Sequence, residues 1–270
     1  MDRRGLLTGL AVVVTAALAG CQDGGRAGAP GDSRSAGDAS PGAGASGTGT
    51  TRRRVFTPPV GLAKVPVPRG TLTRLPGGGR AIALTIDDGT DSAVVGAYAE
   101  LCRATGLRAT FFCNGVNPSW TEHAPVLRQL LDSDQILIAN HTWSHPDLLR
   151  LSAAQVTDQV RRNETFLKNT YGVSGRPFMR PPFGYHNARL DRQLADLGYP
   201  AVTMWLGSLG DATVETPQKI VSMAAEWFLS QHLVIGHANH PPVITVMDRL
   251  IEIIQQRQLQ PVHLGDVFTT

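Results

Sequence analysis

Two adjacent carboxylates end an apolar run near residue 87, and they are the first side chains whose types indicate chemistry. Residues 81–86 are short and continuously apolar, which is typical of a buried strand in a parallel sheet. Asp87, Asp88 and Gly89 follow directly, where catalytic groups of parallel α/β folds lie. Adjacent aspartates repel each other, so a bound cation would explain the pair. Taken alone, a solvated turn explains it equally well.

Two histidines four residues apart, His141 and His145, follow a later apolar segment at residues 135–139. On a helical turn this spacing places both imidazoles on one side, as metal ligation requires. Two histidines and one aspartate form a three-ligand set with open positions, which suits a catalytic zinc or a related divalent ion. Surface or helix-capping histidines are the alternative, and the carboxylate pair at another strand end weakens it.

Polar residues also follow three further predicted strands. Arg180 begins the sequence RPPFG, whose two prolines fix the backbone and hold the guanidinium in a rigid loop, where it can orient a carboxylate. Trp205 and Asp211 follow the next strand, and His237 ends another. Asp211 can fix the tautomer of His237 and favour its protonated form, which would make His237 a general acid. Singly, each of these residues is also compatible with a structural role.

Together and in this order, the motifs resemble those of the polysaccharide deacetylases, the NodB-homology domains of carbohydrate esterase family 4. The matching segments are TIDDG at 85–89, HTWSH at 141–145, RPPFG at 180–184, Trp205 with Asp211, and IGH at 235–237. The resemblance covers about residues 80–270, and its first two motifs are the most specific.

The resemblance implies a metal site and an acid–base pair. The implied metal ligands are Asp88, His141 and His145, with zinc as the first candidate and cobalt as the alternative. The metal would polarise an acetamide carbonyl and lower the pKa of water. The implied roles of the other residues are general base for Asp87, orientation of that base for Arg180, general acid for His237, and support of the acid for Asp211. His240 is the alternative candidate for the acid.

The resemblance also implies a substrate pocket, and here the chain departs from the family pattern. The amide of Phe183 would stabilise the oxyanion, and Trp205 and Ile235 would contact substrate. The family often has proline where this chain has Thr90, and a tryptophan against the acetyl group where this chain has Ala212. The second departure leaves the substrate range open.

Strands and helices are predicted to alternate through the second part of the chain, which favours βαβ units and a parallel sheet. The predicted strands are residues 81–86, 108–113, 135–139, 177–179, 200–204, 232–235 and 261–264. The predicted helices are 92–105 (capped by Asp91 or Ser92), 123–131, one that begins at Ser152 and has apolar positions at helical spacing as far as Leu167, 187–197, 217–229 and 243–256. About seven such units predict an α/β fold, a distorted (β/α)7-type barrel in a single catalytic domain at 61–270. Residues 55–79, rich in proline and glycine, are expected to be an extended lead-in.

The first sixty residues are expected to carry export and anchoring signals. Residues 1–20 combine a basic start, a short apolar stretch and small residues, as in a signal peptide. The sequence LAGC at 18–21 resembles a bacterial lipobox, so Cys21 is the predicted lipidation site. An ordinary signal peptide is the alternative. Residues 21–60, rich in Gly, Ala and Ser, are predicted to be a disordered tether, whose residues 22–54 would have a mean span of roughly 30 Å. This organisation predicts an exported lipoprotein on the outer face of the cytoplasmic membrane, or a secreted protein.

The charge distribution argues against nucleic acid as a partner. The whole chain has a formal charge of +3, but residues 80–270 hold 15 Lys and Arg against 18 Asp and Glu. The basic excess therefore lies in the leader, tether and lead-in, and no basic patch is predicted on the domain. Cys102 and Cys113 are expected to be buried free thiols, although an exported protein could pair them.

These features predict a monomeric, metal-dependent hydrolase that deacetylates N-acetylhexosamine polymers at the cell envelope. Peptidoglycan N-acetylglucosamine is the leading substrate because the tether would place the domain beside the cell wall. Chitooligosaccharides and O-acetylated xylan remain alternatives, as does a carbohydrate-binding pseudoenzyme. An iron oxygenase with two histidines and one carboxylate is disfavoured, because it gives no role to the second aspartate.

Overall fold

The computed structural model describes residues 54–269 of the 270-residue chain. The predicted signal peptide, Cys21 and the tether up to residue 53 lie outside the described residues and remain predictions. Within the described part of the chain, no helix has both the length and the apolar character needed to cross a membrane.

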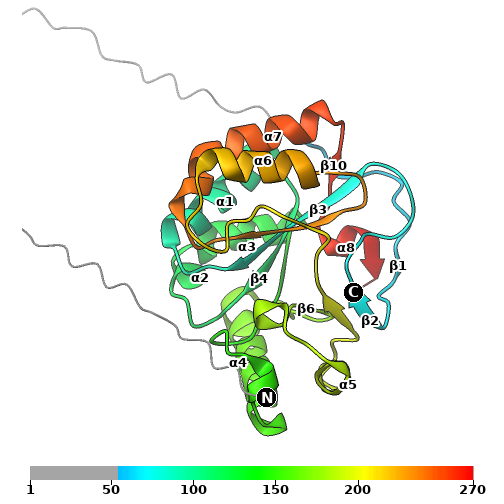
Figure 1. The fold of residues 1–270 in the computed structure, drawn as a ribbon, viewed down its shortest axis with the longest axis vertical. Helices are drawn as coiled ribbons and strands as arrows, with labels where there is room; N and C mark the ends of the chain where they lie inside the picture. Colours follow the sequence, from blue (N-terminus) through cyan, green and yellow to red (C-terminus); the bar gives the residue numbers. More distant parts are fainter. Residues whose placement is uncertain (1–53, 270) are drawn as a thin grey trace, which may run out of the picture. The chain divides into compact units, whose positions relative to one another are not determined.

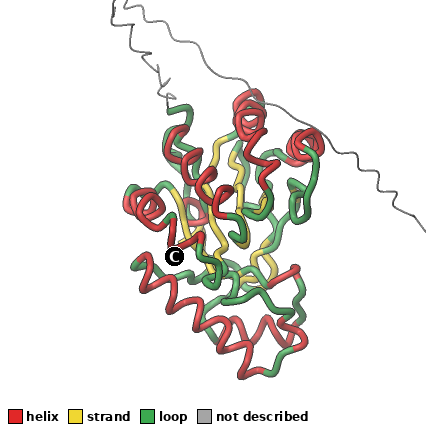
Figure 2. Tube along the Cα trace, turned by 90° about the vertical axis from the view of Figure 1, so that its left-hand side faces the viewer, coloured by secondary structure: helices red, strands yellow, loops and turns green. Residues whose placement is uncertain are grey.

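A curled parallel sheet forms the centre of the domain (Figures 1 and 2). In spatial order its strands are β2 (Gly70–Leu72), β7 (Ala201–Thr203), β6 (Phe178–Met179), β5 (Ile136–Asn140), β4 (Ala109–Cys113), β3 (Ala81–Asp88), β9 (Leu233–His237) and β8 (Gly207–Ser208). All neighbouring strands in this path are parallel, and β10 (Gln260–Pro261) pairs with the start of β3. The predicted α/β fold with a distorted barrel is therefore confirmed.

The barrel is distorted because its two end strands, β2 and β8, do not pair with each other among the described residues. Loop hydrogen bonds connect the two sides instead. After β7 the chain crosses the gap: Met204 N donates to Leu72 O of β2, and Leu206 N donates to Leu233 O of β9. Arg74 also forms an isolated antiparallel bridge with His232. The loop that follows β7 is consequently held on both sides, directly beside the ends of the central strands.

Helices cover the outer face of the sheet. The α-helices are α1 (Ser92–Thr105), α2 (Ser119–Glu122), α3 (Ala124–Asp132), α4 (Ala153–Tyr171), α5 (Ala188–Asp196), α6 (Pro217–Trp227), α7 (Met247–Gln256) and α8 (Leu264–Val267). The 3-10 helices are η1 (Leu148–Arg150), η2 (Pro182–Gly184) and η3 (Pro241–Val246). Along β3, Ile82, Leu84 and Ile86 pack in the cluster that includes α1, α3, α6 and α7, whereas Ala83 belongs to the inner cluster. Because strand side chains alternate, Asp87 lies on the inner face with Ala83.

Several predicted helix ends agree with the structure, whereas the helix predicted from residue 243 begins as an α-helix only at Met247, because Pro241–Val246 forms a 3-10 helix. Asp91 caps α1 by accepting from Val94 N, and Gly106 ends this helix with φ 80°, a left-handed conformation that favours glycine. Ser152 begins α4 with a capping box that includes Gln155. Each cap fixes a helix that follows or precedes a strand of the central sheet.

The lead-in and the C-terminal segment differ from the predictions. The lead-in contains β2 and also β1 (Val65–Pro66), which pairs with β11 (Phe268–Thr269). The last predicted strand, 261–264, is wrong beyond residue 261, because Leu264 begins α8. Residues 54–60, the described end of the predicted tether, contact the domain: Phe56 is buried and its N–H donates to Thr105 O. The packed part of the chain therefore reaches at least as far back as Phe56.

The two cysteines of the described domain, Cys102 and Cys113, are buried free thiols, as predicted. Burial raises the pKa of the Cys102 thiol to about 12, so this side chain behaves as a small apolar group of the core.

Candidate active site

The ends of the central strands bring three potential metal ligands together. Asp88 ends β3, and His141 and His145 follow β5. The Nε2 atoms of His141 and His145 lie 3.2 Å and 3.3 Å from the same atom, Asp88 Oδ1. Asp88 Oδ1 is buried and accepts no hydrogen bond from any residue in 54–269. A buried carboxylate oxygen between two imidazole nitrogens fits a bound cation, and the donor set is one that zinc uses.

His141 is oriented so that its Nε2 atom is free to bind a metal. Its Nδ1 atom lies 2.6 Å from the carbonyl oxygen of Arg180. A carbonyl can only accept, so Nδ1 carries a proton, and Nε2 faces Asp88. This arrangement fixes both the tautomer and the ring orientation that metal ligation needs.

The loop from His141 to His145 is not the helical turn that the spacing predicts. Thr142 has φ 71° and His145 has φ 57°, so two residues other than glycine adopt the left-handed conformation. Tertiary hydrogen bonds stabilise this loop. Asn140 Oδ1 accepts from Thr142 N at 2.9 Å, and Asn114 Nδ2 donates to the carbonyls of His141 and Thr142. The two imidazoles still meet, with ring centroids 4.9 Å apart.

The charges of this cluster shift the pKa values of its members in opposite directions. Burial alone would raise the pKa of Asp88, but the adjacent imidazoles of His141 and His145 hold that pKa well below its usual value. Burial and the positive charge of His141 lower the pKa of His145. Burial alone would lower the pKa of His141, but Asp87 and Asp88 raise it. Metal ligation requires an ionised Asp88 and neutral imidazoles.

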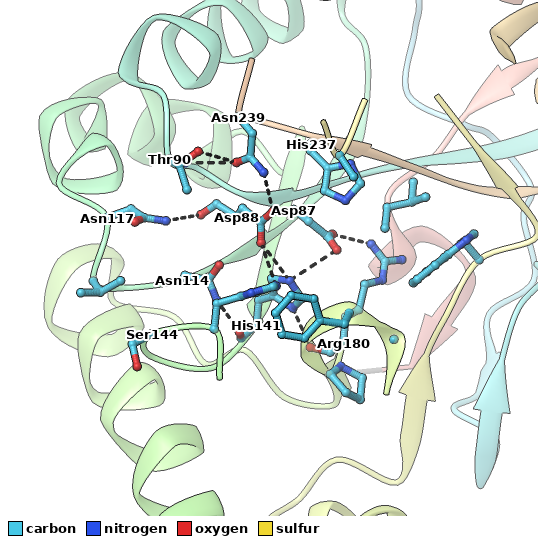
Figure 3. Close-up of a pocket in the computed structure, with 18 residues that line it drawn as sticks. Asp87, Asp88, Thr90, Asn114, Asn117, His141, Ser144, Arg180, His237 and Asn239 are labelled. Carbon is cyan, nitrogen blue, oxygen red and sulfur yellow. Dashed lines mark hydrogen bonds and ion pairs between the residues drawn. The ribbon is translucent and has the colours of Figure 1, made fainter. Parts of the chain in front are cut away.

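Asp87 is held by a buried arginine. Arg180 is fully buried, and its Nη1 atom donates to Asp87 Oδ1 at 2.5 Å (Figure 3). Its other donors bond the carbonyls of Thr203 and Met204 at 3.0 Å and 3.1 Å, and its guanidinium lies 4.2 Å above the Phe112 ring. The guanidinium thus has one orientation and fixes Asp87 Oδ1. The other oxygen, Oδ2, lies 3.5 Å from His141 Nε2 and is available for proton transfer.

His237 is paired with a second buried aspartate. Its Nδ1 atom lies 2.9 Å from Asp211 Oδ1, and its backbone N–H donates to Asp211 Oδ2 at 3.1 Å. Burial alone would lower the pKa of His237, but the hydrogen bond to Asp211 and the charges of Asp87 and Asp211 raise that pKa above its ordinary value. His237 is opposite Asp87 in the register of β9 and β3. The structure therefore places a carboxylate and an imidazole with a raised pKa at one sheet end.

One cavity of about 390 Å³ is lined by the predicted ligands, base and acid and by Arg180, whereas Asp211 lies outside its lining. The three predicted substrate contacts, Phe183, Trp205 and Ile235, also line it, as does Ala212. Phe183 is 56% exposed, has φ 60°, and its ring centroid lies 4.5 Å from that of His145. His240 is absent from the described residues that line the cavity, so its position does not favour it as the acid.

One cavity residue that the sequence patterns do not single out, Asn239, contacts Asp88 directly. Asn239 Nδ2 donates to Asp88 Oδ2 at 2.7 Å, and Asn239 Oδ1 accepts from Thr90 (Figure 3). The only sequence feature that drew attention to this contact was Thr90, which stands where the family often has proline. Nothing local in the sequence indicates that Asn239 approaches Asp88, because that contact depends on the pairing of β3 with β9.

A second group of possible ligands, Asp134, His263 and Asp266, is already satisfied by an arginine. Arg108 donates to both oxygens of Asp266 at 2.6 Å each and lies 2.7 Å from His263 Nε2. It also pairs with Asp134 at 3.2 Å. Because a guanidinium occupies this position, the group stabilises the domain and does not resemble the Asp88 cluster.

Comparison with known proteins finds similarity to polysaccharide deacetylases. A family model described as polysaccharide deacetylase matches residues 74–202. The chain is 35% identical over 144 residues to a chitin deacetylase of a Pestalotiopsis species, covering 53% of this chain and 47% of that protein. It is 31% identical over 103 residues to a peptidoglycan-N-acetylglucosamine deacetylase of Bacillus cereus, covering 38% of this chain and 36% of that protein. The chain thus spans about half or less of the length of these two relatives.

Solved structures share the fold. A carbohydrate esterase family 4 pseudoenzyme from Bacillus anthracis superposes with a TM-score of 0.65 at 17% identity, covering 74% of this chain and 69% of that chain. The fold of the described residues and the match of residues 74–202 to the polysaccharide deacetylase model agree with the ordered motifs. This family comprises hydrolases of acetylated polysaccharides and includes pseudoenzymes.

Proposed function

We propose that this protein is a metal-dependent hydrolase that removes acetyl groups from N-acetylhexosamine polymers at the cell envelope, with peptidoglycan N-acetylglucosamine as its main substrate. One observation carries the proposal. The buried, unpartnered Oδ1 atom of Asp88 lies between two imidazole nitrogens, in the same cavity as Asp87 and His237. A pseudoenzyme would not need all of these groups, and their completeness favours turnover.

Asp88, His141 and His145 would hold the metal, with zinc as the first choice and cobalt as a replacement. When bound, such an ion polarises the acetamide carbonyl and lowers the pKa of water in the cavity. Asp88 would supply Oδ1 and each histidine would supply Nε2, a three-ligand set that would leave positions open for substrate.

The remaining residues move protons and position the substrate. Asp87 Oδ2 accepts a proton from the attacking water, while Arg180 keeps the carboxylate turned towards the cavity. The amide of Phe183 stabilises the oxyanion that develops on the acetyl group. His237 then donates a proton from Nε2 to the departing amine, because Asp211 accepts from Nδ1. The products are acetate and a free amino sugar.

A comparison of acetate release from three polymers tests which of them is the substrate. The zinc-loaded full-length protein is incubated with peptidoglycan, with N-acetylglucosamine oligomers and with O-acetylated xylan, and free acetate is quantified. We expect the highest kcat/KM on peptidoglycan, the polymer that an exported monomer with a lipid anchor at Cys21 would meet. Faster release from chitooligosaccharides or xylan would transfer the proposal to that substrate. Absence of acetate from all three, with one zinc bound per chain, would favour a carbohydrate-binding pseudoenzyme.

The pairing of His237 with Asp211 predicts a shift in the pH profile. The raised pKa of His237 keeps it protonated to higher pH than a free histidine, and activity is lost as pH rises through that pKa. Asp211→Asn removes the charge that raises the pKa, so the alkaline limb of kcat/KM should move to lower pH. At pH 8 we expect a loss of about 10- to 100-fold in rate. An unshifted alkaline limb in Asp211→Asn would contradict the assignment of His237 as the acid.

A further inference from the structure

The two carboxylate oxygens of Asp88 have different surroundings. Oδ1 faces the imidazoles of His141 and His145 and has no hydrogen-bond donor among residues 54–269. Oδ2 accepts a hydrogen bond of 2.7 Å from Asn239 Nδ2. Figure 3 shows Asn239 on the opposite side of the carboxylate from His141. One oxygen is thus free for a cation and the other is already occupied.

The orientation of Asn239 is fixed by Thr90. Asn239 Oδ1 accepts from Thr90 Oγ1 at 2.8 Å and from Thr90 N at 3.3 Å. A backbone N–H can only donate, so the oxygen of the amide must face Thr90 and its nitrogen must face Asp88. The amide assignment therefore follows from the donors on one side and an ionised carboxylate on the other.

Backbone hydrogen bonds place Asn239 beside Asp88. Ala238 N donates to Asp87 O at 2.9 Å, and Asp91 N donates to Ala238 O at 3.1 Å. Ala238, the residue after β9, is thus bonded to Asp87, which precedes Asp88, and to Asp91, which follows Thr90. Asn239 has little freedom to move away from the carboxylate.

The backbone of Asp88 is held as well. Asp88 has φ 72°, and its carbonyl accepts from Trp120 Nε1 at 2.7 Å and from Asn117 Nδ2 at 3.0 Å. With the backbone fixed, rotation of the side chain is the main freedom left to the ligand. The hydrogen bond from Asn239 removes that freedom too.

We propose that Asn239, oriented by Thr90, is a positioning residue that fixes Asp88 as a ligand through Oδ1 alone. Without this hydrogen bond, Oδ2 would be free to turn towards the ion and occupy a position that substrate needs. The inference rests on the proposed metal site. Proline at position 90 would remove both hydrogen bonds to Asn239 Oδ1, because proline has neither the N–H nor the hydroxyl.

The test is zinc affinity, measured by competition with a chromophoric chelator on the full-length protein. Asn239→Ala should weaken zinc binding by about 10- to 100-fold, the usual effect of losing a hydrogen bond to a ligand. Thr90→Val keeps the N–H and should give a smaller loss, whereas Thr90→Pro removes both donors and should approach Asn239→Ala. His240→Ala, which changes the adjacent residue, should bind zinc like the wild type.

Two further readouts distinguish a specific effect on the orientation of Asp88 from a nonspecific loss of structure at the site. Because Thr90 acts through Asn239, the double variant Thr90→Val/Asn239→Ala should lose no more affinity than Asn239→Ala alone. The visible absorption spectrum of the cobalt-loaded protein should change in Asn239→Ala and remain unchanged in His240→Ala.

The outcomes distinguish this inference from the proposed function. If the wild type binds zinc and the Asn239 and Thr90 variants bind it within about twofold of the wild type with the same cobalt spectrum, the inference is overturned. If the wild type itself binds no zinc or cobalt, the proposed metal site fails. If Asn239→Ala does not fold, as judged by circular dichroism, the comparison of Thr90→Val with the wild type decides.

Discussion

Replacing Asp88 with alanine is expected to abolish both zinc binding and acetate release. Asp88 Oδ1 lies within 3.3 Å of both imidazole nitrogens, so no other carboxylate oxygen can take its place without rearrangement of β3. Loss of a direct ligand should exceed the roughly 100-fold upper effect of losing a neighbouring hydrogen bond. Zinc content after gel filtration and the rate of acetate release measure the two effects.

The matched control is Asp134→Ala. Asp134 belongs to the second Asp–His–Asp group, in which Arg108 takes the place of an ion, and its side chain is 83% exposed. This variant should bind zinc and release acetate like the wild type. Zinc retained by Asp88→Ala but lost by Asp134→Ala would move the metal site to the other end of the sheet.

Asp87→Asn is expected to keep zinc and lose turnover. Asparagine has the same shape, and its oxygen can still accept from Arg180, but it cannot take a proton from water. Loss of a general base lowers kcat by about 10²- to 10⁴-fold, and KM should change little. Steady-state kinetics and zinc stoichiometry on the same preparation test this separation.

The variant must be shown to fold, because Arg180 is fully buried and loses its charged partner. Far-ultraviolet circular dichroism of the zinc-loaded variant serves this purpose. Turnover within about threefold of the wild type in a folded Asp87→Asn would overturn the assignment of Asp87 as the base and return that role to another group in the cavity.

The sequence predicted those parts of the fold and site that local patterns determine. The apolar run before Asp87 marked the central strand, and Asp91, Gly106 and Ser152 marked helix ends through well-known capping chemistry. Because parallel strands end at one edge of a sheet, polar residues after different strands were expected to meet. His141 and Asp88 do meet in this way.

Features that depend on tertiary contacts were not predicted. The left-handed loop around Thr142 is stabilised by Asn114 and Asn140, which lie on neighbouring strands or just after them, so residue spacing alone indicated a helical turn instead. Strand β2 has only three residues and no periodicity, and it exists because β7 provides a partner. The contact of Asn239 with Asp88 likewise needs β9 beside β3.

The most direct test of the proposed function is a zinc titration of the metal-stripped, full-length protein with acetate release as the readout. We expect no release without metal, and a rise that reaches a plateau at one zinc per chain, with cobalt able to replace zinc. Full release by the metal-stripped protein, or no release at one bound zinc on any of the three polymers, would contradict metal-dependent deacetylation by this chain.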